Sequence, residues 1–152
     1  WAVRQQGIII APGNPKGITG VRDLKRGTFV SRQAQAGSYI LLDYLMSREN
    51  EDPMNLDMLE TAARSEHDVA LAVADGKADA GFGIEAVARQ NRLEFIPIVK
   101  ERYDLAIWRR DYFEAPLQAV FEFAKSAPFS ARAKELGGYD ISGCGKVRMN
   151  GA

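Results

Sequence analysis

Apolar and polar residues follow one another along the chain in blocks that predict strands leading into helices. Residues 7–11, GIIIA, form an apolar run of strand length, typical of a strand buried on both faces. Residues 28–30 form a shorter apolar run, and the small and polar residues 31–36 predict a loop after it. From Gly37 onward the apolar residues recur at helical spacing, at Ile40, Leu41, Tyr44 and Leu45.

The remainder of the chain repeats this strand–loop–helix pattern. Ser65 and Asp68 have the spacing of a capping box at the start of a helix, and Gly76 lies where a glycine ends one. Residues 78–83, ADAGFG, predict a short strand that ends in a glycine-flanked turn. Further helices are predicted over 84–90, 116–127 and 128–136, and further strands over 95–99 and 103–108.

Strands that alternate with helices in this way predict an α/β fold with crossover connections. In such sheets, ligands bind at the carboxyl ends of the strands. Two loop tips follow predicted strands, one over residues 31–39 and one over residues 81–85. If these tips meet, they form one ligand cleft.

The tip at residues 31–39 has the composition of an anion site. The first N–H groups of a helix lack intrahelical partners, and the helix dipole adds partial positive charge there. Gly37 lets a ligand approach the backbone closely. Side-chain donors are abundant, namely Ser31, Arg32, Gln33, Ser38 and Tyr39. An ordinary N-cap would also explain a serine here, so the sequence leaves both interpretations open.

Composition narrows the function classes. With 46% hydrophobic residues the chain can form a packed core, and 20 basic against 20 acidic residues argue against a nucleic-acid surface. No apolar run is long enough to span a bilayer. The single Cys144 and single His67 exclude an internal disulfide and a cysteine- or histidine-based metal cluster. Since no nucleophile–base pair is evident, we expect no enzyme activity and no cofactor.

Three motifs resemble a known family: NPKGI at 14–18, SRQ…GSY…LLD at 31–43, and ADAGFGIEA at 78–86. Together they resemble a type-2 periplasmic-binding-protein-like domain, of the kind fused to helix-turn-helix regulators and to MoeA-like molybdopterin-biosynthesis proteins. The chain is more distantly similar to molybdate- and tungstate-binding proteins. The resemblance extends to about residue 140.

The resemblance implies two α/β lobes that close over a small ligand, with a mixed sheet and helices on both faces. Residues 1–17 would form a hinge or first-lobe strand and a crossover, 18–98 the second α/β lobe, and 99–152 a hinge strand and C-terminal helices returning to the first lobe. The family's first lobe begins with an earlier strand–loop–helix, so we expect an incomplete first lobe and a piece of a longer protein.

The resemblance also implies roles for individual residues. Ser31, Arg32, Gln33, Gly37, Ser38 and Tyr39 would line the second-lobe side of the cleft. The opposing tip would consist of Gly81, Phe82, Gly83, Ile84 and Glu85. Tyr103 would lie near the hinge, where its ring would cover the ligand.

The resulting functional prediction is a non-enzymatic binding or sensor domain for a small anion such as molybdate or tungstate. The alternatives are a domain that binds a molybdopterin-related ligand, a dimerisation or interaction module, and a transferase or dehydratase on the same fold. The expected partners are the anion and a second copy in a homodimer, without direct nucleic-acid binding or a membrane span. A cytoplasmic location is expected, or a periplasmic one for a transport-binding protein.

Overall fold

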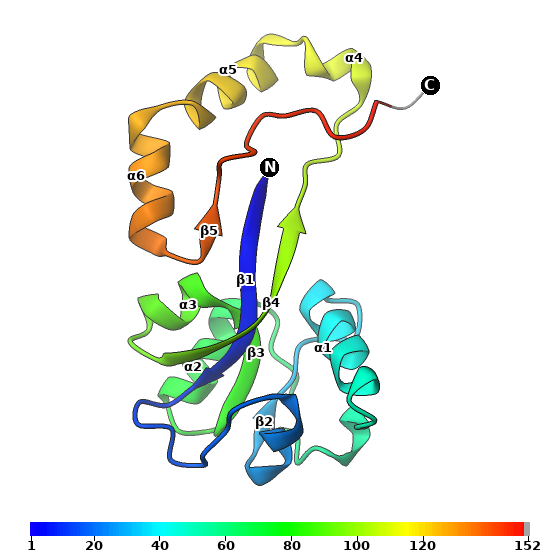
Figure 1. Cartoon of the computed structure of the whole chain (residues 1–152), viewed down its shortest axis with the longest axis vertical. Helices are drawn as coiled ribbons and strands as arrows, with labels where there is room; N and C mark the ends of the chain where they lie inside the picture. The colour runs from blue at the N-terminus through cyan, green and yellow to red at the C-terminus, as the bar shows by residue number, and fades with distance from the viewer. Residues whose placement is uncertain (151–152) are drawn as a thin grey trace. The chain divides into compact units, whose positions relative to one another are not determined.

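The structure is a computed structural model that describes residues 1–150, and the chain divides into two compact units (Figure 1). Unit 2 consists of Gln5–Val99, and unit 1 consists of Trp1–Arg4 and Lys100–Ala152. Two long strands, β1 (Ala2–Ile10) and β4 (Glu94–Tyr103), contribute residues to both units. Each unit is therefore described by itself.

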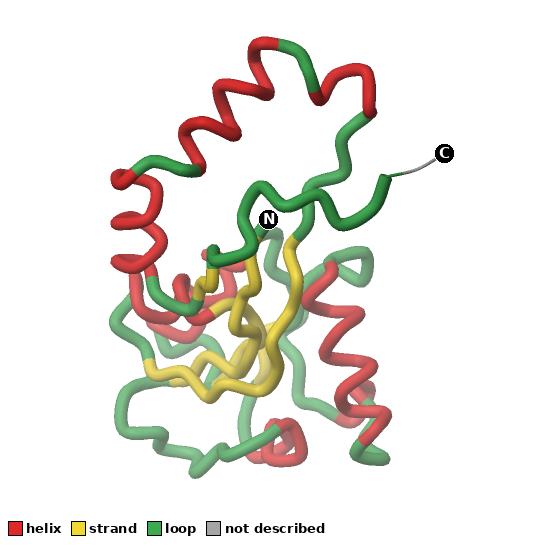
Figure 2. The backbone as a smooth tube through the Cα atoms, turned by 45° about the horizontal axis from the view of Figure 1, so that its top comes forward, coloured by secondary structure: helices red, strands yellow, loops and turns green. Residues whose placement is uncertain are grey.

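Figure 2 shows which parts of the backbone are helices, strands and loops. Unit 2 contains η1 (Val21–Arg26), β2 (Phe29–Val30), α1 (Gly37–Arg48), η2 (Pro53–Asn55), α2 (Glu66–Ala74), β3 (Ala80–Ile84) and α3 (Glu85–Gln90). Unit 1 contains α4 (Arg109–Tyr112), α5 (Ala115–Ala124), α6 (Ala127–Leu136) and β5 (Tyr139–Asp140). The predicted helices at 65–76, 84–90, 116–127 and 128–136 are confirmed to within a few residues, and the short α4 was not predicted.

The sheet of unit 2 has the strand order β2-β3-β1-β4 and is mixed. β2 runs parallel to β3, with Val30 opposite Gly81, whereas β1 runs antiparallel to β3. β4 lies at the edge of this order, a position in a sheet that tolerates a proline such as Pro97. In unit 1, β5 pairs with the first residues of β1. The predicted mixed α/β fold class is confirmed.

Successive residues of β1 enter two different apolar clusters because strand side chains alternate between faces. Ile8 and Ile10 pack in the first cluster with Leu42 and Met46 of α1, together with apolar residues of η1. Ile9 packs in the second cluster, which includes Val69 of α2 and Ala88 of α3. The GIIIA run is thus buried on both faces, as predicted, and helices cover both faces of the sheet.

The buried face of α1 differs from the predicted stripe. Leu42 and Met46 are buried, whereas Ile40 and Tyr44 are 58% and 55% exposed. Leu41 and Leu45 are only partly buried, and they pack against the first cluster from outside. The helix is therefore rotated by about one residue relative to the predicted stripe, because the sheet needs Leu42 and Met46 to fill the space beside Phe82.

The predicted strand over residues 103–108 is wrong. β4 is longer than expected and ends at Tyr103, and residues 104–108 have no regular structure. Leu105 and Trp108 of this segment are 43% and 76% exposed. Alternation of apolar residues therefore did not correspond to a half-buried strand here.

Segment 57–63 forms an additional parallel neighbour of β2. Isolated bridges join Phe29 to Met58 and Arg32 to Ala63 in parallel orientation. The N–H of Leu59 donates to the carbonyl of Phe29 at 2.9 Å, and the N–H of Ala63 donates to the carbonyl of Ser31 at 2.8 Å. The outer edge of β2 is thereby covered by segment 57–63.

Unit 1 packs mainly through aromatic rings that stay partly exposed. The ring centroids of Trp1 and Phe129 lie 6.0 Å apart, and those of Tyr112 and Phe121 lie 5.0 Å apart. Among the described residues of unit 1, the apolar side chains that are buried are those of Ala124 and Ala133. No helix in the described part of the chain has the length and apolarity that a membrane crossing requires.

Candidate functional site

Three helices of unit 2 begin at the same edge of its sheet. Segment 57–63, β2 and β3 run parallel to one another and therefore end at one edge. α2 follows segment 57–63, α1 follows β2, and α3 follows β3, so their N-termini all lie at this edge. Helix N-termini attract anions through free N–H groups and the helix dipole. This edge of the sheet is therefore the candidate site for an anionic ligand.

The first turns of α2 and α3 contain acidic side chains. At α2, Ser65 accepts a hydrogen bond from the Asp68 N–H at 3.0 Å, and Asp68 accepts one from the Ser65 N–H at 2.9 Å. Hydrogen bonds from Ser65 lower the pKa of the Asp68 carboxyl, so this carboxylate stays ionised. α3 has six residues and begins with Glu85. An anion would meet negative charge at both helices.

The N-terminus of α1 is open in comparison. Its N-cap is Ala36, which has no capping side chain, and its first turn contains no acidic residue. Within residues 1–150, no acceptor is found for the N–H groups of Gly37 and Ser38. The Ser38 hydroxyl is also without a hydrogen-bond partner there, although the side chain is only 5% exposed. The alternative interpretation of Ser38 as an ordinary N-cap is therefore wrong.

A small hollow lies beside this N-terminus. Its volume is about 10 Å³, enough for one water-sized group. It is lined by four of the residues predicted on the first tip, Ser31, Arg32, Ser38 and Tyr39, together with Phe29, Val30, Leu42 and Phe82. The structure thus brings Phe82 of the second tip to the residues of the first, because β2 and β3 are neighbours.

Two of the predicted donors have protein partners. The Ser31 hydroxyl donates to the carbonyl of Arg32 at 3.0 Å. The Arg32 guanidinium donates to the carbonyls of Ala63 and Arg64, at 3.2 and 3.1 Å. The side chain of Gln33 is exposed and does not line the hollow. Gly37 is exposed too, and a Cβ at this position would meet open space.

The prediction of a glycine-flanked turn at residues 81–85 is wrong. Gly81 to Ile84 belong to β3 and are buried, and α3 begins directly at Glu85. A Cβ on Gly81 would overlap Val69 and Val30, so this glycine permits close packing of α2 and β2 on β3. Glu85 pairs with Arg89 at 3.6 Å. Gly83, Ile84 and Glu85 do not line the hollow.

Tyr103 belongs to unit 1 and has a partner within that unit. The guanidinium carbon of Arg4 lies 4.5 Å from the centroid of the Tyr103 ring, and Arg4 also pairs with Glu101 at 2.6 Å. A cation over the ring face is favourable electrostatically. The contact of Tyr103 with a ligand stays a prediction.

His67 and Cys144 do not contribute to a recognisable reactive site. His67 is exposed in the first turn of α2. Burial raises the pKa of the Cys144 thiol, which disfavours the thiolate. Among the described residues there is no group of three or more histidine, cysteine, aspartate or glutamate side chains suited to hold a metal ion.

Sequence reasoning missed the part that segment 57–64 plays beside the hollow. The carbonyls of Ala63 and Arg64 accept hydrogen bonds from the Arg32 guanidinium, and the Ala63 N–H donates to the Ser31 carbonyl. The capping box at Ser65 was the sequence feature that could have pointed to this segment. It marks the start of α2, so the residues just before it end where a helix begins. Leu42 and Phe29 also line the hollow. No local sequence pattern distinguishes them from other core residues.

Comparisons with known proteins agree with the fold. The family model described as "PBP superfamily domain" matches residues 1–125. The uncharacterized protein YvgK of Bacillus subtilis (strain 168) is 31% identical over 147 residues, which is 95% of this chain and 47% of that protein. The chain therefore spans about half the length of YvgK. An uncharacterized protein from a ferredoxin gene 5′ region of Clostridium pasteurianum is 35% identical, covering 71% of this chain and 96% of that protein.

Among solved structures, L-phospholactate-bound PEB3 has a similar fold. The TM-score is 0.62 at 15% sequence identity, over 91% of this chain and 66% of that chain. At this identity the likeness concerns the fold alone.

Proposed function

The chain belongs to the PBP superfamily, and on this premise we propose that it binds a small oxyanion at the N-terminus of α1. Molybdate and tungstate are the leading candidates. The binding is non-enzymatic, as expected of a solute-binding or sensor domain. The site comprises the hydroxyl of Ser38, the N–H groups of Gly37 and Ser38, and the hollow lined by Ser31, Tyr39 and Phe82.

The main support for this proposal is the Ser38 hydroxyl, which has no hydrogen-bond partner in the protein. A buried polar group without a hydrogen bond costs about 1–3 kcal/mol. No protein group among the described residues offsets this cost for Ser38, which lies at the one helix N-terminus of the edge that has neither a capping side chain nor a first-turn acid. An oxygen atom of a bound anion would accept hydrogen bonds from the Ser38 hydroxyl and the adjacent N–H groups, and would remove the cost.

The size and charge of the site favour a compact oxyanion. The hollow of about 10 Å³ admits one ligand oxygen. The rest of the anion would lie in the open space in front of Gly37. Uncharged donors and oriented N–H groups suit an oxyanion that remains ionised without a paired cation. A molybdopterin-related ligand with an anionic end is an alternative for the same donors.

A thermal-unfolding series tests the proposal. The protein is heated with millimolar sodium molybdate, tungstate, sulfate or phosphate, and with sodium chloride at matched ionic strength. An anion at one hundred times its dissociation constant stabilises the folded state by about 2.7 kcal/mol, which raises Tm visibly. A rise with molybdate or tungstate alone supports the proposal. An unchanged Tm with every anion contradicts it.

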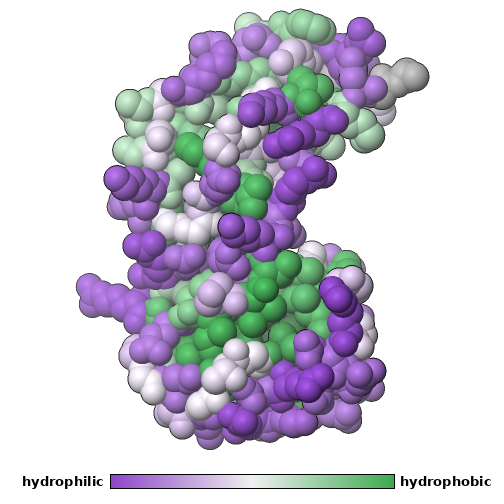
Figure 3. Space-filling model, viewed as in Figure 1, coloured by the Kyte–Doolittle hydropathy of each residue, from purple (hydrophilic) through white to green (hydrophobic). Residues whose placement is uncertain are grey.

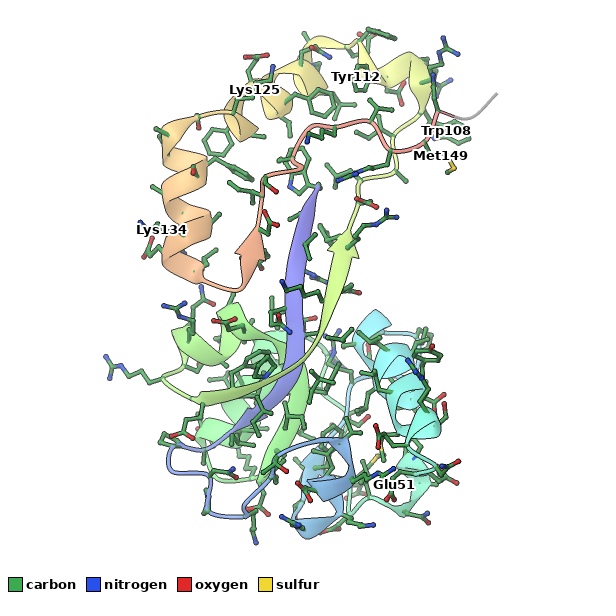
Figure 4. The ribbon with its side chains drawn as sticks, in the orientation of Figure 1. Glu51, Trp108, Tyr112, Lys125, Lys134 and Met149 are labelled. Carbon is green, nitrogen blue, oxygen red and sulfur yellow. The ribbon has the colours of Figure 1, made fainter. Side chains whose placement is uncertain are left out.

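A second candidate function is self-association through unit 1, and its exposed apolar residues favour it. Trp108 is 76% exposed, Phe113 72% and Met149 88%. Figure 4 labels Trp108 and Met149, and Figure 3 shows apolar surface among charged residues on this unit. Large exposed apolar side chains gathered in one region are typical of an interface. Light scattering at increasing protein concentration distinguishes a homodimer, whose mass doubles, from a monomer of constant mass.

The remaining expectations from the resemblance stay predictions. They are lobe closure on the ligand, fusion to a regulator or molybdopterin-biosynthesis protein, and a cytoplasmic rather than periplasmic location. A transferase or dehydratase remains the enzymatic alternative. It requires a nucleophile or acid–base pair at the site, and the lining of the hollow contains neither a carboxylate nor an imidazole.

A further inference from the structure

The Arg32 guanidinium is directed at the backbone of the neighbouring segment. Its Nε donates to the carbonyl of Ala63 at 3.2 Å, and its Nη2 donates to the carbonyl of Arg64 at 3.1 Å. The backbones of the two segments are also joined, because the Ala63 N–H donates to the Ser31 carbonyl at 2.8 Å. Three hydrogen bonds thus connect the loop after β2 to Ala63 and Arg64.

This arrangement depends on the shape of an arginine side chain. The guanidinium is planar and holds its N–H donors in a fixed fork, so it can reach two successive carbonyls at once. A lysine ammonium carries the same charge but has no such fork. The Arg32–Ala63 bridge lies beside the hollow that Ser31 and Arg32 line. Loss of the fork would therefore loosen one wall of the hollow while leaving a positive charge in place.

We propose that Arg32 is a positioning residue, which fixes the wall of the anion hollow by bracing the Ala63 and Arg64 carbonyls, and does not supply the charge that meets the ligand. This inference rests on the proposed function, since it concerns the same hollow. It assigns contact with the anion to uncharged donors, the hydroxyl of Ser38 and the N–H groups of Gly37 and Ser38.

The first arm of the test needs no ligand. Hydrogen exchange at the Ala63 amide is measured by NMR in the wild type, in Arg32→Lys and in Arg22→Lys. Arg22 is a matched control, because its guanidinium also reaches a backbone carbonyl, that of Glu49 at 3.3 Å, and it does not line the hollow. Arg32→Lys weakens hydrogen bonds from a charged donor, so it should speed exchange at Ala63 by about tenfold or more. Arg22→Lys should leave that rate unchanged. Equal rates at Ala63 in Arg32→Lys and the wild type overturn the proposal.

The second arm separates bracing from direct charge contact. Sodium molybdate is titrated into the wild type, Arg32→Lys and Arg32→Gln at two salt concentrations. A brace predicts that both variants lose affinity to a similar degree, about tenfold, with the salt dependence of the wild type retained. Direct contact predicts that Arg32→Lys binds nearly as well as the wild type while Arg32→Gln does not, and this result overturns the proposal.

The two arms also distinguish failure of the inference from failure of the proposed function. If none of the four anions, molybdate, tungstate, sulfate and phosphate, binds to the wild type, the proposed anion-binding function is wrong. The exchange rate at Ala63 still decides in that case whether Arg32 braces the segment.

Discussion

Unit 2 and unit 1 are stabilised in different ways. Unit 2 has a sheet with a buried apolar cluster on each face, and side chains such as Ile9 and Phe29 are 0% and 1% exposed. Unit 1 has no comparable cluster among its described residues, and its rings, such as Phe123 at 58%, stay partly exposed. The larger the apolar area that is removed from water, the larger the stabilisation. Unit 2 is therefore expected to supply most of the stability of this chain.

Unit 2 and unit 1 also differ in the functions proposed for them. The open N-terminus of α1, the hollow and the Arg32 brace all lie within Gln5–Val99. Unit 1 instead presents exposed aromatic residues. The difference suggests that the proposed anion site belongs to the well-packed unit, whereas the proposed self-association belongs to the loosely packed one.

The largest expected effect comes from removing a core ring of unit 2. Phe29→Ala should lower the free energy of unfolding by about 3–5 kcal/mol, because it leaves a cavity in the first cluster. Phe123→Ala in unit 1 removes an exposed ring whose centroid lies 5.8 Å from that of Phe129, and should cost about 1 kcal/mol or less. Urea denaturation followed by circular dichroism measures both. Similar losses for the two variants would contradict the difference between the units.

A medium effect is expected at Gly81. A methyl group at this position would overlap the Val69 and Val30 side chains, which are buried and stiff. Gly81→Ala should therefore cost about 1–3 kcal/mol through overpacking. Gly20→Ala is the control, since no heavy atom lies within 4 Å of its Cβ position. Equal midpoints in urea for the two variants would show that Gly81 is not required for packing.

The smallest effect concerns pH and the capping box of α2. Hydrogen bonds from Ser65 lower the pKa of Asp68 below its ordinary value of 3.8. Below pH 3.8 the unfolded chain therefore takes up this proton before the folded one does, and stability falls as pH falls through the lowered pKa. The advantage of the wild type over Asp68→Asn should be present at neutral pH and should shrink in strong acid. Urea midpoints across this range measure it, and an advantage that grows in acid would contradict the assignment.

The alternation of strands and helices was enough to predict much of the fold. The GIIIA run, the capping box at Ser65 and the glycine after α2 each depend on local chemistry, and all three are confirmed. Two predictions failed because packing decides them. The α1 stripe depends on which residues fit beside Phe82, and the alternation at 103–108 has no sheet neighbour to pair with.

The site too was predicted only where it depends on local sequence. The loop after β2 and the open helix start follow from residues 31–39, and the hollow is lined by four of them. The sequence did not reveal that Arg32 turns toward segment 57–63, because that contact spans 31 residues of chain. Nor did it reveal that Gly81 serves packing, since a glycine in a strand and one in a turn look alike locally.

Calorimetric titration of sodium molybdate into the wild type, Ser38→Ala and Ser47→Ala measures whether the Ser38 hydroxyl binds the anion. Ser47 is the control on the same helix, because its hydroxyl is exposed and donates to the Tyr44 carbonyl at 2.8 Å. Ser38→Ala removes an unpartnered buried hydroxyl, so the ligand-free protein should be at least as stable as the wild type. Ser38→Ala should weaken molybdate binding by about tenfold or more, and Ser47→Ala should not. Equal affinity of Ser38→Ala and the wild type would contradict the proposed role of Ser38.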